Sequence, residues 1–370
     1  MIRRAFQAGL AAALLAGCGA DRTTPPEKPH GYVAGAEETS EAQWRLVLAG
    51  DGRVSLLDPA TEKLTDVTAA NITGARTDGR FAYLTTPAGI RTLDTGVWTV
   101  DHGDHVHYYK TSARDVGTVP GTSTGVTGDP AITTMANGKT VRILDRKALE
   151  SGKVPAARDV PGTAAVAYAE HLIIAAADGT VRVHDRQGAE RSRLTARCPQ
   201  ARGQAVTRRG AVLGCADGAL LITDRLTGIK IAYPSRVRAA ERATDFHHRP
   251  GTPVLAAKAG GRGLWILNLA ARSWKRVGSA PLTAVSGTGE DTPVLALDTN
   301  GKLRSYDPAT GSERDQTTLP GSSIQVDTAR AYVNDPEGRR VIEIDYRDGL
   351  RVSRTFTVPF APVHMVETGW

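Results

Sequence analysis

The sequence lacks several features that mark nucleotide-binding, thiolate-metal and membrane-spanning proteins. It has no phosphate-binding loop of the form Gly-x-x-x-x-Gly-Lys-Ser/Thr and no Cys-x-x-Cys pair, and only 3 of its 370 residues are cysteine. Helical periodicity is weak from Trp44 onward, which argues against an α-helical domain. The N-terminal apolar run, Ala5 to Ala16, is too short to cross a bilayer as a mature helix. Carboxylates are plentiful, but no pair can be assigned to acid–base catalysis.

The N-terminus predicts an export signal. Arg3 and Arg4 precede the apolar run, which ends in Leu15-Ala16-Gly17-Cys18 and resembles a bacterial lipobox. The resemblance implies that residues 1–18 are a lipoprotein signal peptide, cleaved before Cys18, and that the Cys18 sulfur is lipidated. The alternative is an ordinary signal peptide with an incidental cysteine. We therefore expect an extracytoplasmic protein that reaches the cell membrane only through its lipid anchor.

Composition changes after the signal. Residues 19–43 are rich in Pro, Thr, Glu and Gly, which predicts a flexible tether to a folded domain over residues 44–370. The formal net charge of +7 falls to +5 when Arg3 and Arg4 leave with the signal. Because the basic residues are scattered, we expect no nucleic acid partner. An anionic cell envelope is a sufficient reason for the basic balance.

One unit recurs from Trp44 to the C-terminus. Each copy has an apolar strand, a tight turn, a second strand and a closing Asp or Asn. The closing residues are Asp58, Asp94, Asp145, Asp185, Asp224, Asn268, Asp307 and Asp345. Most are separated by about forty residues, which is the spacing of β-propeller blades. Eight copies predict an all-β fold, an eight-bladed β-propeller.

The two ends of the domain are expected to close this ring. The tail from Thr355 to Gly369 is strand-like with no second strand after it, and the first copy has no inner strand before Trp44. The tail is therefore predicted to supply the inner strand of the first blade, which removes exposed sheet edges. This arrangement would place His364 near the central channel.

Cys198 and Cys215 are the remaining cysteines. An isolated pair in an exported protein is usually a disulfide, and a hairpin turning near Thr207 to Gly210 would bring the two opposite each other. We expect a structural bond, with a redox-active pair as the alternative.

A histidine tract stands out from the repeat. Three of the nine histidines lie within Asp101-His102-Gly103-Asp104-His105-Val106-His107. The step from Asp94 to Asp145, 51 residues, is the longest between closing residues and contains this tract. Extra length in a regular array usually forms a functional loop on one face. The tract therefore predicts a metal site in an inserted loop.

The spacing of the tract suits convergence of its side chains. In an extended strand His105 and His107 share a face, whereas Val106 and Tyr108 would point the other way, into protein. Gly103 can adopt the backbone angles of a sharp bend, which would return the preceding residue toward the same point.

Convergence would place His102 beside the other two imidazoles. Asp104 or Asp101 lies close enough in sequence to ligate a metal or to orient a ring through its second nitrogen. Three imidazoles with one carboxylate or water form a tetrahedral zinc shell, although copper or nickel would also accept these nitrogens. The alternative is a polar surface loop without a metal.

Three further histidines are candidates to complete the shell. His247 and His248 lie where the innermost strand of a blade is expected, and as neighbours at most one of them can face the channel. His364 is a similar candidate. His171 and His184 lack acidic or histidine neighbours at ligand spacing and are expected to be structural.

The tract also resembles a known family. The segment Gly96 to Tyr109, within an eight-copy propeller that ends in Pro362 to Gly369, is similar to the AztD-type zinc metallochaperones. The positions that match the His-rich motif of the family are His102, Asp104, His105 and His107. The resemblance implies an exported propeller that holds Zn²⁺ and passes it to the solute-binding protein of a zinc ABC importer. We expect this protein to be a monomer.

One segment departs from the family. A Cys-Pro-x-x-His-Gly-Glu stretch of the family corresponds here to Cys198 to Gln204, which carries Arg202 and Gln204 in place of His and Glu. A contribution of this region to zinc binding is therefore in doubt. The resemblance implies a carrier and not an enzyme; the alternatives are a metal-free interaction propeller and a zinc-dependent hydrolase.

Overall fold

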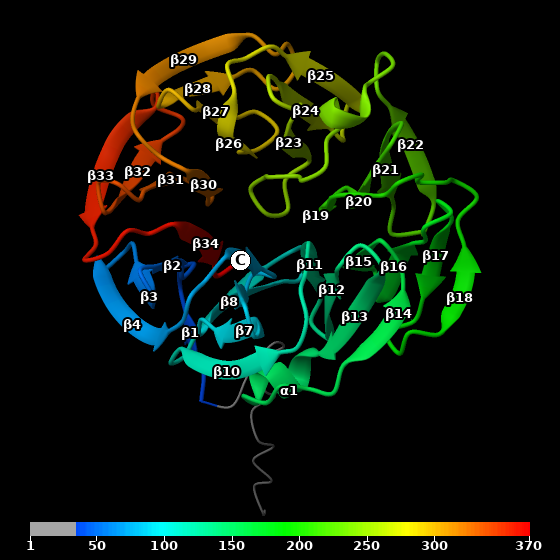
Figure 1. Ribbon diagram of the computed structural model, residues 1–370, viewed down its shortest axis with the longest axis horizontal. Coiled ribbons are helices and arrows are strands. Elements are labelled where there is room, and N and C mark those ends of the chain that lie inside the picture. Colours follow the sequence, from blue (N-terminus) through cyan, green and yellow to red (C-terminus); the bar gives the residue numbers. More distant parts are fainter. Residues whose placement is uncertain (1–34) are drawn as a thin grey trace, which may run out of the picture.

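The computed structural model describes residues 35–370, which form an all-β protein (Figure 1). Within this part of the chain the strands form nine antiparallel sheets, seven of four strands and two of three. Eight sheets stand around a ring, and the ninth is a small sheet of order β1-β9-β8. Among the same residues no helix is both long and apolar enough to cross a bilayer. The predicted signal peptide of residues 1–18 and the predicted lipidation site Cys18 lie outside the described residues.

The seven four-stranded sheets each run from an innermost strand to an outer strand on the rim of the ring (Figure 1). The innermost strands are β34 (His364–Thr368), β5 (Gly74–Thr77), β11 (Gly125–Gly128), β15 (Ala164–Tyr168), β19 (Gln204–Thr207), β26 (Leu282–Gly287) and β30 (Ser323–Val326). The second strands are β2 (Arg45–Gly50), β6 (Phe81–Thr86), β12 (Ile132–Ala136), β16 (His171–Ala175), β20 (Gly210–Cys215), β23 (Val254–Lys258), β27 (Val294–Asp298) and β31 (Ala331–Asp335).

The remaining elements complete the sheets and their connections. The third strands are β3 (Arg53–Asp58), β7 (Gly89–Asp94), β13 (Thr140–Asp145), β17 (Val181–His184), β21 (Gly218–Ile222), β24 (Leu264–Asn268), β28 (Lys302–Tyr306) and β32 (Arg340–Asp345). The outer strands are β4 (Lys63–Ala69), β10 (Arg114–Val119), β14 (Arg158–Pro161), β18 (Glu190–Arg193), β22 (Gly228–Ala232), β25 (Ser273–Val277), β29 (Glu313–Thr318) and β33 (Arg351–Thr357). The others are β1 (Glu37–Thr39), β8 (Val97–Asp101), β9 (Val106–Lys110), the helix α1 (Arg146–Glu150) and the 3₁₀ turn η1 (Ala239–Glu241).

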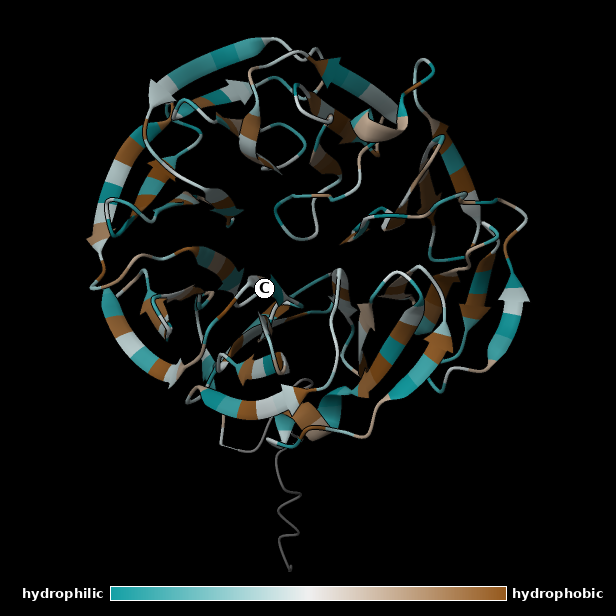
Figure 2. Cartoon of the chain, viewed as in Figure 1, coloured by the Kyte–Doolittle hydropathy of each residue, from teal (hydrophilic) through white to brown (hydrophobic). Residues whose placement is uncertain are grey.

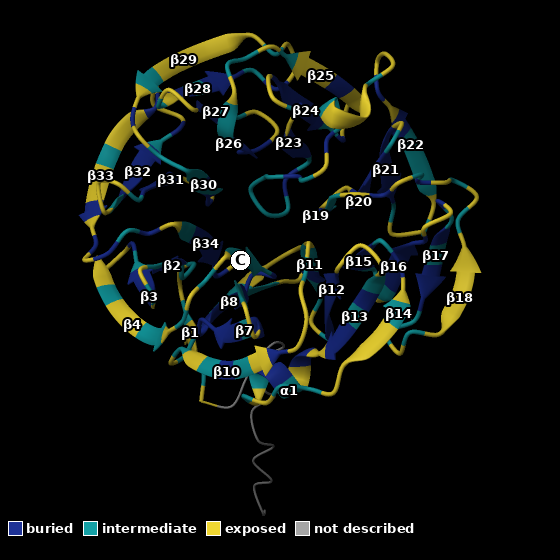
Figure 3. Ribbon diagram, in the orientation of Figure 1, coloured by how far each residue is buried: buried dark blue, intermediate teal, exposed yellow. Residues whose placement is uncertain are grey.

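Burial follows the position of each strand. The second strand β20 is buried along its whole length, whereas the outer strand β18 is exposed along its whole length (Figure 3). Figure 2 shows the same division as hydrophobic inner strands and more hydrophilic strands on the rim. Side chains such as Leu46 and Leu48 are 0% exposed, and burying each contributes about 2 kcal/mol. The core therefore lies between the faces of adjacent sheets.

The closing acidic residues of the repeat lie at the ends of the third strands. The Asp58 carboxylate accepts hydrogen bonds from the backbone N–H groups of Ala60 and Thr61. Asp307 accepts from the second and third residues after it in the same way. Asp145 instead caps the N-terminus of α1. The periodic acid recognised in the sequence is thus a turn-forming device, because a carboxylate satisfies the free N–H groups of the turn.

The prediction that the C-terminal tail joins the first sheet is confirmed. β34 pairs with β2, with His364 opposite Ala49 and Thr368 opposite Arg45, in a sheet of order β34-β2-β3-β4. β34 also contacts the innermost strands β5 and β30 on its two sides. The last strand of the chain, β34, and the first strand of the ring, β2, are therefore held in one sheet.

The sheet of β23, β24 and β25 has three strands. Where its innermost strand is expected, a single bridge joins His247 to Ala256, and His248 bridges to Gly287 of the next sheet. The predicted innermost position of these histidines is confirmed, but the strand is reduced to isolated pairs.

The predicted tether over 19–43 is too long at its C-terminal end. Glu37–Thr39 forms β1, which pairs with β9 in the order Glu37 to Lys110, Glu38 to Tyr109 and Thr39 to Tyr108. The composition of the segment did not reveal this, because its partner strand lies about seventy residues further on and three polar residues carry no strand pattern. The residues before Gly35 lie outside the described part of the chain.

The expected disulfide is present. Cys198 and Cys215 are bonded, with their Cα atoms 5.0 Å apart, and both side chains are buried. The hairpin of β19 and β20 turns at Thr207 to Gly210, and its ladder continues outward through the bond from Ala216 N to Pro199 O. The geometry predicted from the spacing is therefore confirmed.

Removing this bond is expected to destabilise the domain. The closed loop spans a separation of 17 residues, so the variant Cys198→Ala/Cys215→Ala is predicted to lose about 3 kcal/mol of free energy of unfolding. Urea denaturation of wild type and variant measures the difference. Reductant should lower the midpoint of the wild type and leave that of the variant unchanged, and an equal effect on both proteins would contradict the prediction.

Candidate metal centre

The histidine tract lies on a hairpin inserted between the third and outer strands of one sheet. β7 ends at Asp94 and β10 begins at Arg114, and the hairpin of β8 and β9 occupies the chain between them. Its base closes where Thr111 N donates to Gly96 O over 2.7 Å. The insertion accounts for the long step of the repeat, as the sequence predicted.

The tip of the hairpin is a tight turn at Gly103 and Asp104. His102 N donates to His105 O over 3.0 Å, so these two histidines lie opposite each other across the turn. Gly103 has a φ of 91°, a left-handed conformation that glycine adopts without strain. Its N–H donates to Asp101 Oδ1 over 2.8 Å. The bend predicted at Gly103 is therefore present and is what returns His102 toward its partners.

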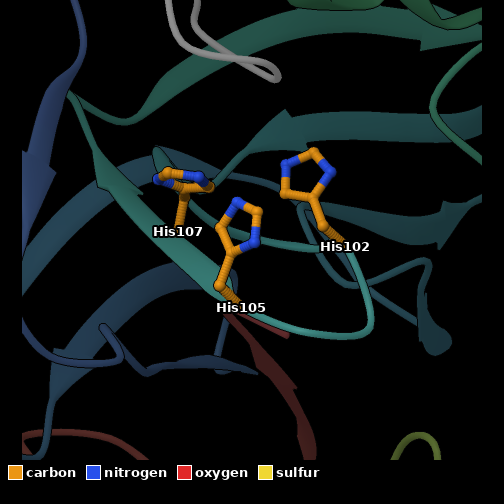
Figure 4. A group of neighbouring side chains, drawn as sticks. All are labelled: His102, His105 and His107. Carbon is orange, nitrogen blue, oxygen red and sulfur yellow. The ribbon is translucent and has the colours of Figure 1, made fainter.

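The three imidazoles converge. One ring nitrogen from each of His102, His105 and His107 can be chosen so that all lie within 4.8 Å of one another, and Figure 4 shows the rings gathered around a common space. The ring centroids are 4.8 Å apart for His102 and His105, 5.3 Å for His102 and His107, and 4.9 Å for His105 and His107. No other such group of His, Cys, Asp and Glu occurs among residues 35–370.

This triad fits a tetrahedral zinc ion after a small adjustment. Zn–N bonds of about 2.0–2.1 Å place ligand nitrogens roughly 3.3 Å apart. Nitrogens that span up to 4.8 Å must therefore approach by roughly 1.5 Å, which side-chain rotation at an exposed turn can supply. Three imidazoles leave the fourth position open to water or to a ligand from another molecule.

The face that carries the histidines is also the face that anchors the hairpin. Trp98 lies opposite Tyr109 in the register, and their rings stack with centroids 5.3 Å apart. Tyr109 is 0% exposed and follows His107 on the same face of β9. The prediction that Val106 faces into protein is wrong, since Val106 is exposed. The buried aromatic on this strand is one residue further along than the tract alone indicated.

A buried ion pair holds the base of the hairpin. The Arg80 guanidinium donates to both carboxylate oxygens of Asp94, at 3.1 and 2.9 Å, and both side chains are 1% exposed. The guanidinium carbon also lies 3.8 Å from the centroid of the Trp98 ring. The Arg80 charge thus holds Trp98, the second residue of β8, through the face of its ring.

The opposite face of the hairpin rests on the ring. Thr99 Oγ1 donates to Gly369 O near the C-terminus. At the tip, Arg208 Nη2 lies 2.7 Å from Asp101 Oδ2, which joins the hairpin to the turn between β19 and β20. Burial raises the pKa of Asp101, but the Gly103 N–H and the Arg208 charge outweigh it, and the pKa is lowered.

Two carboxylates contact the ring nitrogens that face away from the common space. Asp104 Oδ1 lies 2.8 Å from His105 Nδ1, and Glu38 Oε1 lies 2.6 Å from His107 Nδ1. A carboxylate accepts, so each Nδ1 carries the proton and each Nε2 is the nitrogen available to a metal. Asp104, predicted either to ligate or to orient a ring, lies in the orienting position. Glu38 was missed in the sequence because it lies 69 residues from its partner.

His247 is occupied at the channel side of the ring. Its Nε2 lies 3.5 Å from Asp245 Oδ2, which is also 3.3 Å from Arg76 Nη1. Burial raises the pKa of Asp245, but the hydrogen bond and charge of His247, together with Arg76, lower it to about 2. His247 therefore belongs to an ion-pair network that involves the innermost strand β5.

The other two completing candidates also lie apart from the triad. His248 Nε2 lies 3.2 Å from Val206 O, and burial lowers the pKa of His248 to about 4. Burial likewise lowers the pKa of His364. Neither residue joins the group formed by His102, His105 and His107 within the described chain.

The region that departs from the resembling family is structural here. Cys198 is bonded to Cys215 and carries no free thiol. The amide of Gln204 packs against Gly125 of the innermost strand β11, two sheets away in the ring. Arg202 is exposed, and its N–H donates to Gly214 O. No part of this segment lies in the triad.

A Gly-x-Ser-x-Gly spelling at residues 121–125 is not a nucleophile elbow. Ser123 lies in the loop between β10 and β11, and its Oγ donates to the carbonyl oxygens of Gly125 and Ala136. An elbow needs a strand, a sharp turn and then a helix, and β11 follows here instead.

Comparison with known proteins identifies the fold. The chain is similar to AztD from Citrobacter koseri with a TM-score of 0.69 and 17% identity, over 89% of this chain and 98% of that one. Apo AztD from the same organism matches with a TM-score of 0.69 and 16% identity over the same shares. The dihydro-heme d1 dehydrogenase NirN matches with a TM-score of 0.58 and 13% identity, over 93% of this chain and 78% of that one. No protein-family model and no curated protein matches the sequence. The AztD-type fold is thereby shown.

Neutralising the anchor of the hairpin is expected to destabilise the protein. Asp94→Asn removes the carboxylate that the buried Arg80 contacts through two hydrogen bonds and leaves only Glu150, 3.6 Å from Arg80 Nη1, as a counter-charge, so the free energy of unfolding should fall by about 3 kcal/mol in urea denaturation. The matched control is Asp348→Asn, which removes an exposed pair with Arg351 and should cost less than about 1 kcal/mol. Equal losses in the two variants would contradict this role of Asp94.

Proposed function

We propose that this protein binds zinc reversibly at the hairpin triad and delivers it to the solute-binding protein of a zinc ABC importer. The observation that carries the proposal is the convergence of three imidazoles within 4.8 Å on one inserted hairpin. The similarity of the fold to that of AztD supports the proposal. The histidine tract supports it separately, because it is the part of the sequence that resembles the AztD-type metallochaperones. Imidazole nitrogens are common ligands of zinc, whereas magnesium and calcium prefer oxygen ligands.

The geometry suits a carrier that must also release its metal. His105 is 58% exposed and His107 is 25% exposed, so an incoming ligand can approach the triad from solvent. The proposed transfer is a ligand exchange, in which a ligand of the acceptor protein takes the open fourth position and the imidazoles then leave one by one. The triad contains no thiolate, which would hold zinc more firmly and is open to oxidation.

We propose that the mature protein is extracytoplasmic, is anchored to the membrane by lipid and is a monomer. The lipobox-like segment ending at Cys18 supports the anchor, and the disulfide between Cys198 and Cys215 suits an oxidising compartment. The fold proposed with this function is an eight-bladed propeller. It is supported by the seven four-stranded sheets that share one strand order, by the three-stranded sheet of β23, β24 and β25 and by the pairing of β34 with β2.

Two other functions make different predictions. A zinc-dependent hydrolase would also use three histidines and an open position, but the two carboxylates at the triad, Asp104 and Glu38, already contact the rings of His105 and His107. A metal-free interaction propeller would bind no stoichiometric zinc. Metal analysis of protein purified without a histidine tag separates the propeller without metal from the other two functions. Zinc transfer to a purified solute-binding protein, measured beside hydrolase assays, separates carrier from enzyme.

Removing two of the three imidazoles should abolish zinc binding. His105→Ala/His107→Ala leaves one ligand of the triad, so stoichiometric zinc should be lost while the fold is retained, since both side chains are partly exposed. Metal analysis after dialysis measures the zinc, and circular dichroism measures the fold. The control is His171→Ala, which removes a histidine whose Nδ1 bonds the Ala169 carbonyl. Zinc retention by the double variant would rule the assignment out.

Acidification should release the zinc. Protons compete with the metal for imidazole nitrogens, so affinity should fall more than tenfold between about pH 7.5 and about pH 5.5. Competition with a chelator of known pH dependence gives the affinity at each pH. Burial lowers the pKa of His248 to about 4, so the folded protein keeps this ring neutral while the unfolded chain protonates it. The free energy of unfolding therefore declines as the pH falls below about 6.5. Circular dichroism must accompany the titration to show that the protein remains folded. A flat affinity profile in folded protein would contradict imidazole ligation.

A further inference from the structure

β1 supplies a carboxylate to the triad from outside the hairpin. It is the third strand of the small sheet and lies along β9, with Glu38 directly opposite Tyr109. Residues opposite each other share a face, and Tyr109 shares its face of β9 with His107. Glu38 can therefore reach diagonally to His107, where its Oε1 lies 2.6 Å from Nδ1.

This contact fixes the orientation of one zinc ligand. With Nδ1 donating to Glu38, the His107 ring presents Nε2 to the space shared with His102 and His105. A carboxylate at this position also makes the other nitrogen a better electron donor to a metal. Its neighbour Glu37 points to the other face and pairs with Lys110 at 3.2 Å, so it contributes nothing to the ring orientation.

The attachment of β1 is weak beside that of the hairpin. β1 has three residues, none of them apolar, and Glu37 and Glu38 are exposed. Besides its backbone ladder and the contact of Glu38 with His107, it is held by the exposed pair of Glu37 with Lys110 and by Thr39 Oγ1, which lies 3.4 Å from Tyr108 O. The hairpin, in contrast, is anchored by buried side chains at Trp98. Short exposed elements of this kind open locally without unfolding the rest of a protein.

We propose that Glu38 is a positioning residue for zinc and that docking of β1 onto β9 sets the affinity of the triad. The inference rests on the proposed zinc site and adds a way to lower its affinity. When β1 is docked, Glu38 holds His107 in its ligating orientation. When β1 leaves β9, the hairpin and its three histidines remain in place, but His107 loses its partner and the site releases zinc more readily.

Linkage makes the coupling reciprocal. If docked β1 strengthens zinc binding, bound zinc must stabilise docked β1 by the same factor. Backbone amides of residues 36–41 should therefore exchange with solvent more slowly when zinc is bound. This effect on β1 can be measured without any transfer assay.

The first test measures zinc affinity by chelator competition. Glu38→Ala should weaken binding by about 10–100-fold, the usual cost of losing a carboxylate partner of a ligating histidine. Glu38→Gln keeps an acceptor oxygen and should lose less. The matched control Glu37→Ala removes the neighbouring carboxylate of the same strand and should stay within about threefold of wild type.

A double-mutant cycle asks whether Glu38 acts through His107. In a His107→Ala background, measured with a weaker chelator, Glu38→Ala should have no further effect. An undiminished loss in that background, or equal losses for Glu37→Ala and Glu38→Ala in the wild-type background, would overturn the role of Glu38.

Hydrogen exchange completes the test. Zinc should slow exchange at residues 36–41 in wild type and in Glu37→Ala, but not in Glu38→Ala. Equal zinc-dependent protection in all three proteins would overturn the coupling. Absence of zinc binding in the wild type would instead overturn the proposed function itself, so the two failures are distinguishable.

Discussion

The buried ion pair between Arg80 and Asp94 is the interaction on which the position of the histidine triad depends. The corresponding acid of the first sheet, Asp58, accepts hydrogen bonds from the backbone of an exposed turn. Asp94 also accepts from the N–H of Gly96, but its carboxylate is buried and bound by Arg80 through two hydrogen bonds. Burying two charges costs hydration energy. The two parallel hydrogen bonds from Arg80 to Asp94 and the contact of the guanidinium with the Trp98 ring offset this cost. The regular turn of the repeat is thereby converted into a rigid base for the hairpin.

From that base the triad is positioned by elements that are remote in sequence. Arg208, on a different sheet, holds the tip through Asp101, and the C-terminal Gly369 supports the middle of the hairpin through Thr99. The ligands themselves stay partly exposed. A rigid frame with accessible ligands is what reversible binding requires, since the frame limits the adjustment needed to bind zinc and the exposure admits a competing ligand.

Much of this architecture could be predicted from the sequence, because the features that encode it are local or periodic. Alternating buried strands and closing acids such as Asp58 repeat at regular intervals, and the spacing of His105 and His107, with a glycine at 103, encodes a convergent turn. The remainder depends on long-range pairings that no local pattern encodes. Glu38 meets His107 across 69 residues and Arg208 meets Asp101 across 107. The orientation of Val106 was mispredicted because Val106 lies at the exposed tip end of β9, whereas burial on this strand begins only toward its base, at Tyr109.

The central claim is that three imidazoles on one hairpin bind a single zinc ion. Anomalous diffraction at the zinc edge, from crystals of zinc-loaded protein, tests it directly. The account predicts one strong peak about 2.0–2.1 Å from a nitrogen of each of His102, His105 and His107, with the fourth position filled by a water or another exchangeable ligand. A zinc peak elsewhere in the protein, with these three rings turned away from any common centre, would contradict it.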